Sequence, residues 1–143
     1  MNEDQSWSTK TILISNARVY NARVTETPGS GIVIVTEPID AHRLTEMAAE
    51  RFGDMVKAVV DANRRLLALG GDLHSDEEAA LLALGSTQSD LWGINIYPDQ
   101  PRSEWIEFDS LINVRPRFGN RSRGVEDAAT RQLIREIVDS LIR

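Results

Sequence analysis

The chain has 143 residues, of which 41% are hydrophobic and 27% are charged, a composition typical of one soluble domain that can bury a core. It contains no cysteine and two histidines, which excludes disulfides, a thiolate nucleophile and cysteine- or histidine-rich metal sites. The net charge of -6 argues against broad nonspecific DNA binding. No long apolar run and no secretory start occur, so we expect a cytoplasmic protein that does not enter a membrane.

Residues 1–30 are predicted to form an N-terminal extension to a single α+β domain at residues 31–143. The extension begins with a polar tail at residues 1–10 and continues with one or two short strands between Thr11 and Thr25. It ends in the turn-forming run TETPGSG. The glycines of this run precede a strand and lack a third glycine, so we reject a dinucleotide-binding fingerprint.

The first half of the domain is predicted to contain a strand, a helix and a hairpin. The apolar run IVIVT indicates a buried strand, and apolar spacing predicts a helix from about Asp40 to Phe52. Residues 55–69 fit either one amphipathic helix or two strands that turn around Asn63 and Arg64. The β-branched run VKAVV favours the hairpin.

Two more helices are predicted, one at residues 75–84 and one from about Glu126 to Ile142. Ser75 and Glu78 have the spacing of a capping box, which places the start of the first of them. The last helix carries an apolar stripe that suits packing on a sheet. The resulting fold class is α+β, a mostly antiparallel sheet of about five strands with three helices.

Residues 90–123 are predicted to supply two further strands and an arginine-rich turn. Successive side chains of a strand point to opposite faces, so a period of two assigns residues to sides. The polar side of this strand pair is predicted to carry Asn95, Tyr97, Glu107, Asp109, Asn113 and Arg115. A sheet with one solvent-exposed face shows the same alternation without any function, and this alternative stays open.

The loop before the last helix is a candidate anion site. Asn120, Arg121, Ser122 and Arg123 approach a helix N-terminus, where backbone N–H groups and arginine forks suit phosphate or carboxylate. The alternative is a solvated basic turn that forms ion pairs with Glu126 and Asp127.

Proton transfer and metal binding are assigned to three side chains. His74 precedes Asp76 and Glu77 and is either a general base or simply a residue at a strand–helix junction. Glu107 and Asp109 are two residues apart on one strand face, close enough to share a divalent cation such as Mg²⁺ or Mn²⁺, although no cofactor is firmly implied. A phosphoesterase or ribonuclease is the enzyme class that these residue types would suit.

The runs GGDLHSDEEAALLALGSTQSDLWGINIYP and WIEFDSLINVRPRFGNRSRGVED resemble a small prokaryotic family catalogued only as a domain of unknown function. Matching runs extend back to VTEP and FGDMVKAVVD, so the resemblance covers about Ile32 to the C-terminus. It implies one compact domain from Ile32 onward and brings no activity, substrate or partner.

Two functions are therefore expected. The first is binding of, or action on, a phosphate- or carboxylate-bearing molecule. Its catalytic candidates are His74, Glu107 and Asp109, and its ligand-binding candidates are Asn95, Tyr97, Asn113, Arg115, Asn120, Arg121, Ser122 and Arg123. The second is a non-catalytic module that forms a homodimer or binds another protein, with Trp92, Trp105 and Tyr97 as anchors.

Overall fold

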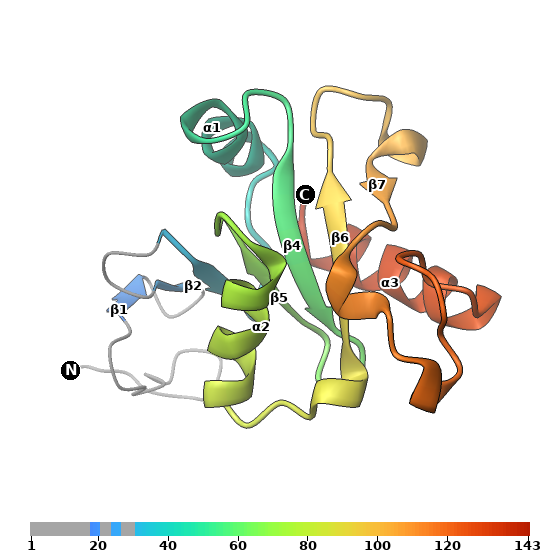
Figure 1. Ribbon diagram of the computed structural model, residues 1–143. Helices are drawn as coiled ribbons and strands as arrows, with labels where there is room; N and C mark the ends of the chain where they lie inside the picture. The colour runs from blue at the N-terminus through green and yellow to red at the C-terminus, as the bar shows by residue number, and fades with distance from the viewer. Residues whose placement is uncertain (1–17, 21–23, 27–30) are drawn as a thin grey trace.

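A computed structural model describes residues 18–20, 24–26 and 31–143; the predicted polar tail and most of the predicted TETPGSG turn lie outside these residues. The main element is an antiparallel sheet of seven strands in the order β1-β2-β3-β5-β4-β6-β7 (Figure 1). The strands are β1 Arg18–Tyr20, β2 Val24–Glu26, β3 Val33–Val35, β4 Val56–Asp61, β5 Leu66–Leu69, β6 Leu91–Ile96 and β7 Ile106–Glu107. Strands β3 to β7 belong to the predicted domain, and β1 and β2 of the extension add to the edge at β3.

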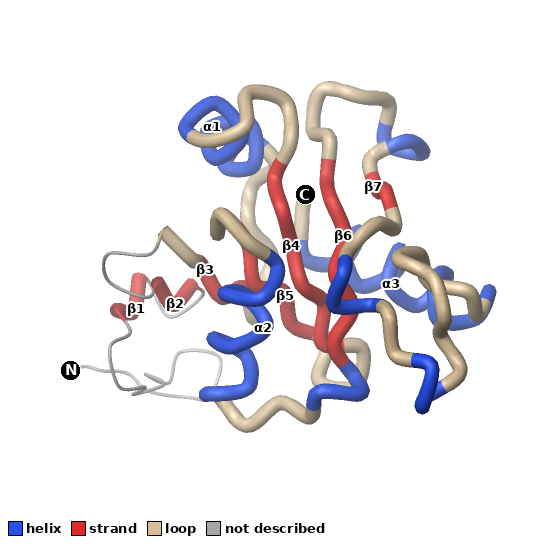
Figure 2. Tube along the Cα trace, in the orientation of Figure 1, coloured by secondary structure: helices blue, strands red, loops and turns tan. Residues whose placement is uncertain are grey.

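In the described part of the chain, three α-helices cover the two faces of the sheet: α1 His42–Glu50, α2 His74–Ala83 and α3 Ala128–Leu141. Helices α1 and α3 pack on one face, where one apolar core contains Leu44 of α1, Ile94 of β6 and Ile134 of α3. Helix α2 packs on the opposite face (Figure 2), where Leu81 joins residues that include Leu91. The α+β class, the antiparallel sheet and the docked C-terminal helix are confirmed. Within the described part of the chain, no helix combines the length and apolar character needed to cross a membrane.

The hairpin favoured for residues 55–69 is present as β4 and β5, paired from Ala58↔Leu69 to Asp61↔Leu66. The fully buried Asp61 organises its turn, because one carboxylate oxygen accepts the backbone N–H groups of Asn63 and Arg64 at 2.9 and 2.8 Å. Arg65 completes the turn with a φ of 58°, a left-handed conformation that costs a non-glycine residue about 1–2 kcal/mol.

The second strand predicted from Trp105 to Arg115 is wrong over most of its length. β7 ends at Glu107, and the chain then forms short 3₁₀ helices at Leu111–Asn113 and Pro116–Phe118. The reason is that side chains, instead of a backbone strand, close the edge of β6 beyond β7. The carboxamide of Asn113 accepts from Gly93 N and donates to Gly93 O, at 2.8 and 2.9 Å.

The same segment packs very closely on β6. A Cβ atom on Gly93 would lie 2.5 Å from Ser110 Cβ, so only glycine admits this approach. Arg115 continues the edge by donating to Leu91 O and to Gln88 O. The side chains of residues 110–115 thus satisfy backbone groups at the edge of β6 without adding a strand to the sheet.

The capping box predicted at Ser75 and Glu78 is also wrong. Helix α2 begins at His74, its N-cap is Leu73, and no side chain caps it. Glu77 turns inward instead and accepts a hydrogen bond from Gly71 N at 2.9 Å. Helix α3 does have a side-chain cap, because Asp127 accepts from Thr130 N at 2.9 Å.

Candidate functional site

A group of polar side chains lies on the α2 side of the sheet, where β4, β6 and β7 meet the start of α2. We call it the polar cluster, and it consists of Lys57, His74, Glu77, Asn95, Tyr97, Glu107, Asp109 and Arg123. Lys57 and Glu107 flank Asn95 in register on its two neighbouring strands, so the three side chains share one face. Six members were candidates from the sequence, and Lys57 and Glu77 were missed.

Glu107 is the best-positioned carboxylate of the polar cluster. It is solvent-exposed, yet its Oε1 accepts hydrogen bonds from Asn95 Nδ2 at 2.9 Å and from Tyr97 Oη at 3.0 Å. Burial of the Tyr97 ring, its hydrogen bond to Glu107 and the nearby acids raise the pKa of its phenol. Tyr97 therefore stays protonated and keeps donating, which fixes the carboxylate and leaves its second oxygen for a hydroxyl or amine.

Asp109 lies beside Glu107 but is held differently. Its carboxylate forms an ion pair with Arg123 Nε, and both side chains are about half-exposed. The backbone carbonyl of Asp109 accepts a second bond from Asn95 Nδ2 at 3.3 Å. An exposed ion pair of this kind contributes only about 0–1 kcal/mol, so a ligand can compete for the Arg123 donors.

His74 occupies the buried side of the polar cluster. Its Nε2 lies 2.8 Å from Ile94 O, and because a carbonyl can only accept, Nε2 carries the proton. Burial is the main cause that lowers the pKa of His74, with a further contribution from the positive charge of Lys57. The imidazole is therefore neutral near pH 7, with Nδ1 as a hydrogen-bond acceptor.

Glu77 is a buried acid one helical turn beyond His74. Desolvation raises the pKa of its carboxyl group well above the ordinary value. Glu77 Oε1 and Asn95 Oδ1 are both buried and have no hydrogen-bond partner among the described residues. The polar cluster thus holds two oxygen atoms that could each accept or share a proton.

Replacing Glu77 with glutamine is expected to stabilise the protein above neutral pH. The folded state favours the protonated acid, so the stability that Glu77 contributes is complete below about pH 4.5 and is lost as the pH rises through the raised pKa. Glu77→Gln keeps the acceptor for Gly71 N and removes the charge. Denaturant unfolding should show a gain of about 1–3 kcal/mol at pH 8 and almost none at pH 4.5. Glu50→Gln, at an exposed acid of α1, is the matched control, and an equal gain at both pH values would contradict the assignment.

Three of the ligand-binding candidates serve the fold instead. Asn113 is buried, and its amide contacts Gly93 and the backbone carbonyl of Arg123. Arg115 donates to backbone carbonyls, and its guanidinium carbon lies 4.4 Å from the ring centre of Trp92. Asn120 donates to three backbone carbonyls and accepts from Glu126 N. We therefore leave these three residues out of the candidate site.

The predicted anion site before α3 is filled by a carboxylate of the chain itself. Arg121 N and Ser122 N both donate to Glu126 Oε2 at 2.8 Å. These backbone hydrogen bonds, together with the Ser122 hydroxyl and the charge of Arg121, lower the pKa of Glu126. The structure thus favours the alternative in which the basic turn is paired internally, and Arg121 and Ser122 also leave the candidate site.

Metal binding gains no support from the geometry. In the ranges that the structure describes, no group of three or more acidic or histidine side chains is arranged to hold a cation. Asp109 is paired with Arg123, and one oxygen of Glu107 is bound by Asn95 and Tyr97. Both carboxylates therefore already have partners within the chain.

Comparison with known proteins supports the resemblance found in the sequence. A family model described as "Protein of unknown function (DUF5674)" matches residues 33–141, which is most of the chain. No curated protein and no solved structure gives a match. The match begins at β3 and ends with α3, so it contains the whole polar cluster. The chain therefore belongs to the DUF5674 family, whose function is unknown.

Proposed function

We propose that the polar cluster binds a small molecule that carries a carboxylate or phosphate group together with hydroxyl or amino donors. The observation that carries this proposal is the arrangement around Glu107. A solvent-exposed acid on a sheet face has no structural need for two neutral donors, yet Asn95 and Tyr97 fix one of its oxygens. Fixing a group before the ligand arrives lowers the entropic cost of binding.

A free hydrogen-bond acceptor of the polar cluster calls for a donor group on the ligand. Asn95 and Tyr97 both donate to Oε1 of Glu107, so its second oxygen is left for a donor on the ligand. A ligand with a hydroxyl or an amino group would donate to this oxygen, whereas an aliphatic ligand that covered it would leave it unpaired at a cost of about 1–3 kcal/mol.

The anionic group of the ligand is assigned to Lys57 and Arg123. Lys57 lies opposite Asn95 in register, and its ammonium group makes a contact with the Phe52 ring at 5.4 Å. Arg123 uses Nε for Asp109, so the rest of its fork is available to a carboxylate or phosphate. The positive charges of Lys57 and Arg123 offset the negative charges of Glu107 and Asp109. A ligand that carries both an anionic group and hydrogen-bond donors is complementary to this arrangement of charges.

The alternative function, a protein-interaction module, rests on different residues from those expected. Trp105 is buried, and Trp92 is partly buried beneath Arg115, so neither forms an exposed anchor. The two most exposed large apolar side chains of the described residues are instead Leu111 and Phe118, at 70% and 65% exposure, with Val114 nearby in sequence. These residues line a groove that does not include the polar cluster. Light scattering, which measures the oligomeric state in solution, tests the homodimer form of this function.

A thermal-shift screen tests the ligand-binding proposal. The screen compares inorganic phosphate and acetate with a hydroxy acid, an amino acid and a sugar phosphate. We expect the compounds that carry both an anionic group and a hydroxyl or amino donor to raise the unfolding midpoint. Glu107→Gln or Tyr97→Phe should lower the affinity for the best of these compounds by about tenfold or more.

Glu104→Gln, at an exposed acid in the loop between β6 and β7, is the matched control and should bind as the wild type does. The proposal is wrong if no compound raises the wild-type midpoint. It is equally wrong if Glu107→Gln binds the best compound as tightly as the control.

A further inference from the structure

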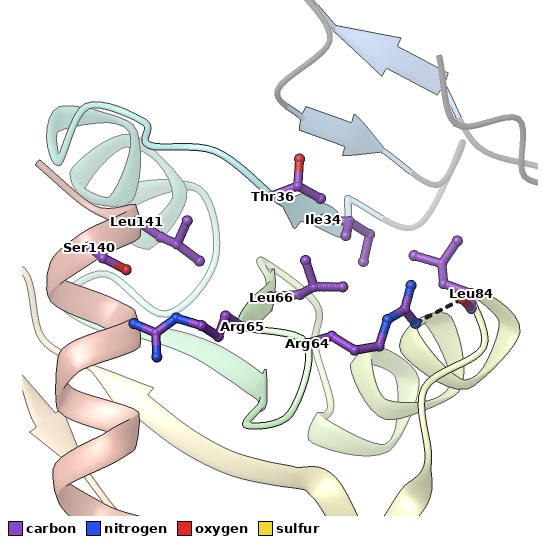
Figure 3. A pocket seen from close by; sticks show the side chains of 8 residues that line it. All are labelled: Ile34, Thr36, Arg64, Arg65, Leu66, Leu84, Ser140 and Leu141. Atoms are coloured by element: carbon purple, nitrogen blue, oxygen red, sulfur yellow. Dashed lines mark hydrogen bonds between the residues drawn. The ribbon is translucent and has the colours of Figure 1, made fainter. Parts of the chain in front are cut away.

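A second candidate site lies at the turn of the β4–β5 hairpin, at the opposite end of β4 from Lys57. It is a hollow of about 440 Å³ between β3, the hairpin turn and the C-terminal ends of α2 and α3 (Figure 3). Ile34, Leu66, Leu84 and Leu141 supply its apolar surface, and Arg64 and Arg65 flank Leu66. The hollow shares no residue with the polar cluster.

The size and lining of the hollow suit an organic anion. Its volume falls within the range of pockets that hold small molecules, roughly 300–1,000 Å³. None of the described residues that line it is acidic, although the chain as a whole has a net charge of -6. Two arginines beside four aliphatic side chains would attract an anion that also has an apolar body.

Arg64 is anchored at the side of α2. Its Nη1 donates to Leu84 O at 2.9 Å, which is the bond drawn in Figure 3, and to Ser86 Oγ at 3.4 Å. Asp61 holds the backbone of the same residue. Arg64 therefore forms a fixed positive wall of the hollow.

Arg65 differs from Arg64 in two respects. It adopts a φ of 58° at the end of a hairpin turn, a position where glycine is favoured. Its guanidinium makes no hydrogen bond or ion pair within the described ranges, and in Figure 3 it extends toward α3 and Ser140. The fold therefore gains nothing visible from arginine at this position, and residues held in sparsely populated backbone conformations cluster at active sites and ligand clamps.

We propose that the hollow binds an organic anion whose carboxylate or phosphate group contacts Arg65 and whose apolar body lies on Ile34, Leu66, Leu84 and Leu141. The anion differs from the ligand of the polar cluster, because none of the described residues around this hollow offers a carboxylate to hydroxyl or amino donors. The two sites are independent, so the failure of one does not affect the other.

Isothermal titration calorimetry on the full chain tests this site with hexanoate, hexyl phosphate, hexanol, acetate and inorganic phosphate. We expect hexanoate or hexyl phosphate to bind at least about tenfold more tightly than hexanol, acetate or inorganic phosphate, because only they engage both Arg65 and the apolar surface. A preference between hexanoate and hexyl phosphate identifies the anionic group.

Arg65→Gly should weaken that binding by about tenfold or more while the unfolding midpoint stays equal or rises, since glycine relieves the backbone strain. Asn63→Gly, in the same turn, is the matched control and should bind as the wild type does. The proposal is overturned if Arg65→Gly binds the probes as the wild type does, or if neither amphipathic anion binds the wild type at about 10 mM. It is also overturned if Glu107→Gln, and not Arg65→Gly, removes the binding.

Discussion

Replacing Asn113 with alanine is expected to lower the free energy of unfolding by about 3–5 kcal/mol. The fully buried carboxamide of Asn113 is the only side chain described that bonds both the N–H and the C=O of Gly93. It also donates to Arg123 O at 2.9 Å. Alanine would leave these buried backbone groups without hydrogen-bond partners. Each unsatisfied group lowers the free energy of unfolding by about 1–3 kcal/mol.

Urea unfolding of Asn113→Ala and the wild type measures this loss directly. Asn63→Ala is the matched control, because it removes the same carboxamide from an exposed turn and should change stability by less than about 0.5 kcal/mol. A loss below about 1 kcal/mol for Asn113→Ala would show that the edge of β6 does not depend on this amide.

Asp61→Ala is expected to cost about 2–4 kcal/mol, the second-largest effect. Asp61 is buried and accepts from two backbone N–H groups of its own turn. Its second oxygen accepts from Ser86 Oγ at 2.6 Å, which ties the hairpin to the segment after α2. All three donors lose their partner when the carboxylate is removed.

Ser86→Ala separates the two duties of Asp61, because it removes the link to the hairpin but keeps the turn. Chemical unfolding of both variants should give a loss of about 1 kcal/mol for Ser86→Ala, well below that of Asp61→Ala. Equal losses would mean that the turn hydrogen bonds add nothing to stability.

The fold was predictable wherever one face of an element is buried. Apolar and polar residues alternate along β6, and β4 is rich in β-branched residues. Both patterns reflect burial in a sheet, so β6 and the β4–β5 hairpin were predicted from them. Residues 105–115 alternate in the same way, but their backbone leaves the sheet after Glu107. The pattern cannot reveal this, because a single carboxamide at Asn113 replaces the missing strand.

The polar cluster was predictable in part for the same reason. Asn95 and Glu107 were assigned to one face by the period of two, and they are hydrogen-bonded in the structure. Lys57 was missed, although a lone charge inside the apolar run VKAVV was the available signal. Glu77 was missed because the capping assignment treated it as exposed, whereas its spacing of four from Leu81 places it on the buried face of α2.

The arginine-rich loop shows the limit of reasoning from residue types. Helix N-termini and arginines do attract anions, but the residue types alone do not show whether a ligand or a carboxylate of the chain itself occupies the site. Glu126 lies close enough in the chain to accept from Arg121 N and Ser122 N itself. Competition of this kind depends on local backbone geometry, which composition does not encode.

The most direct measurement follows, in a ¹H–¹⁵N spectrum, the side-chain amides of the three asparagines that are buried among the described residues, while the best small anion of the thermal-shift screen is added. Asn95 contacts Glu107, whereas Asn113 and Asn120 bond only to backbone groups. Binding at the polar cluster predicts that the Asn95 amide signals shift with saturation and that those of Asn113 and Asn120 stay in place. Unchanged Asn95 signals at saturating ligand, or equal shifts of all three amides, would contradict the account.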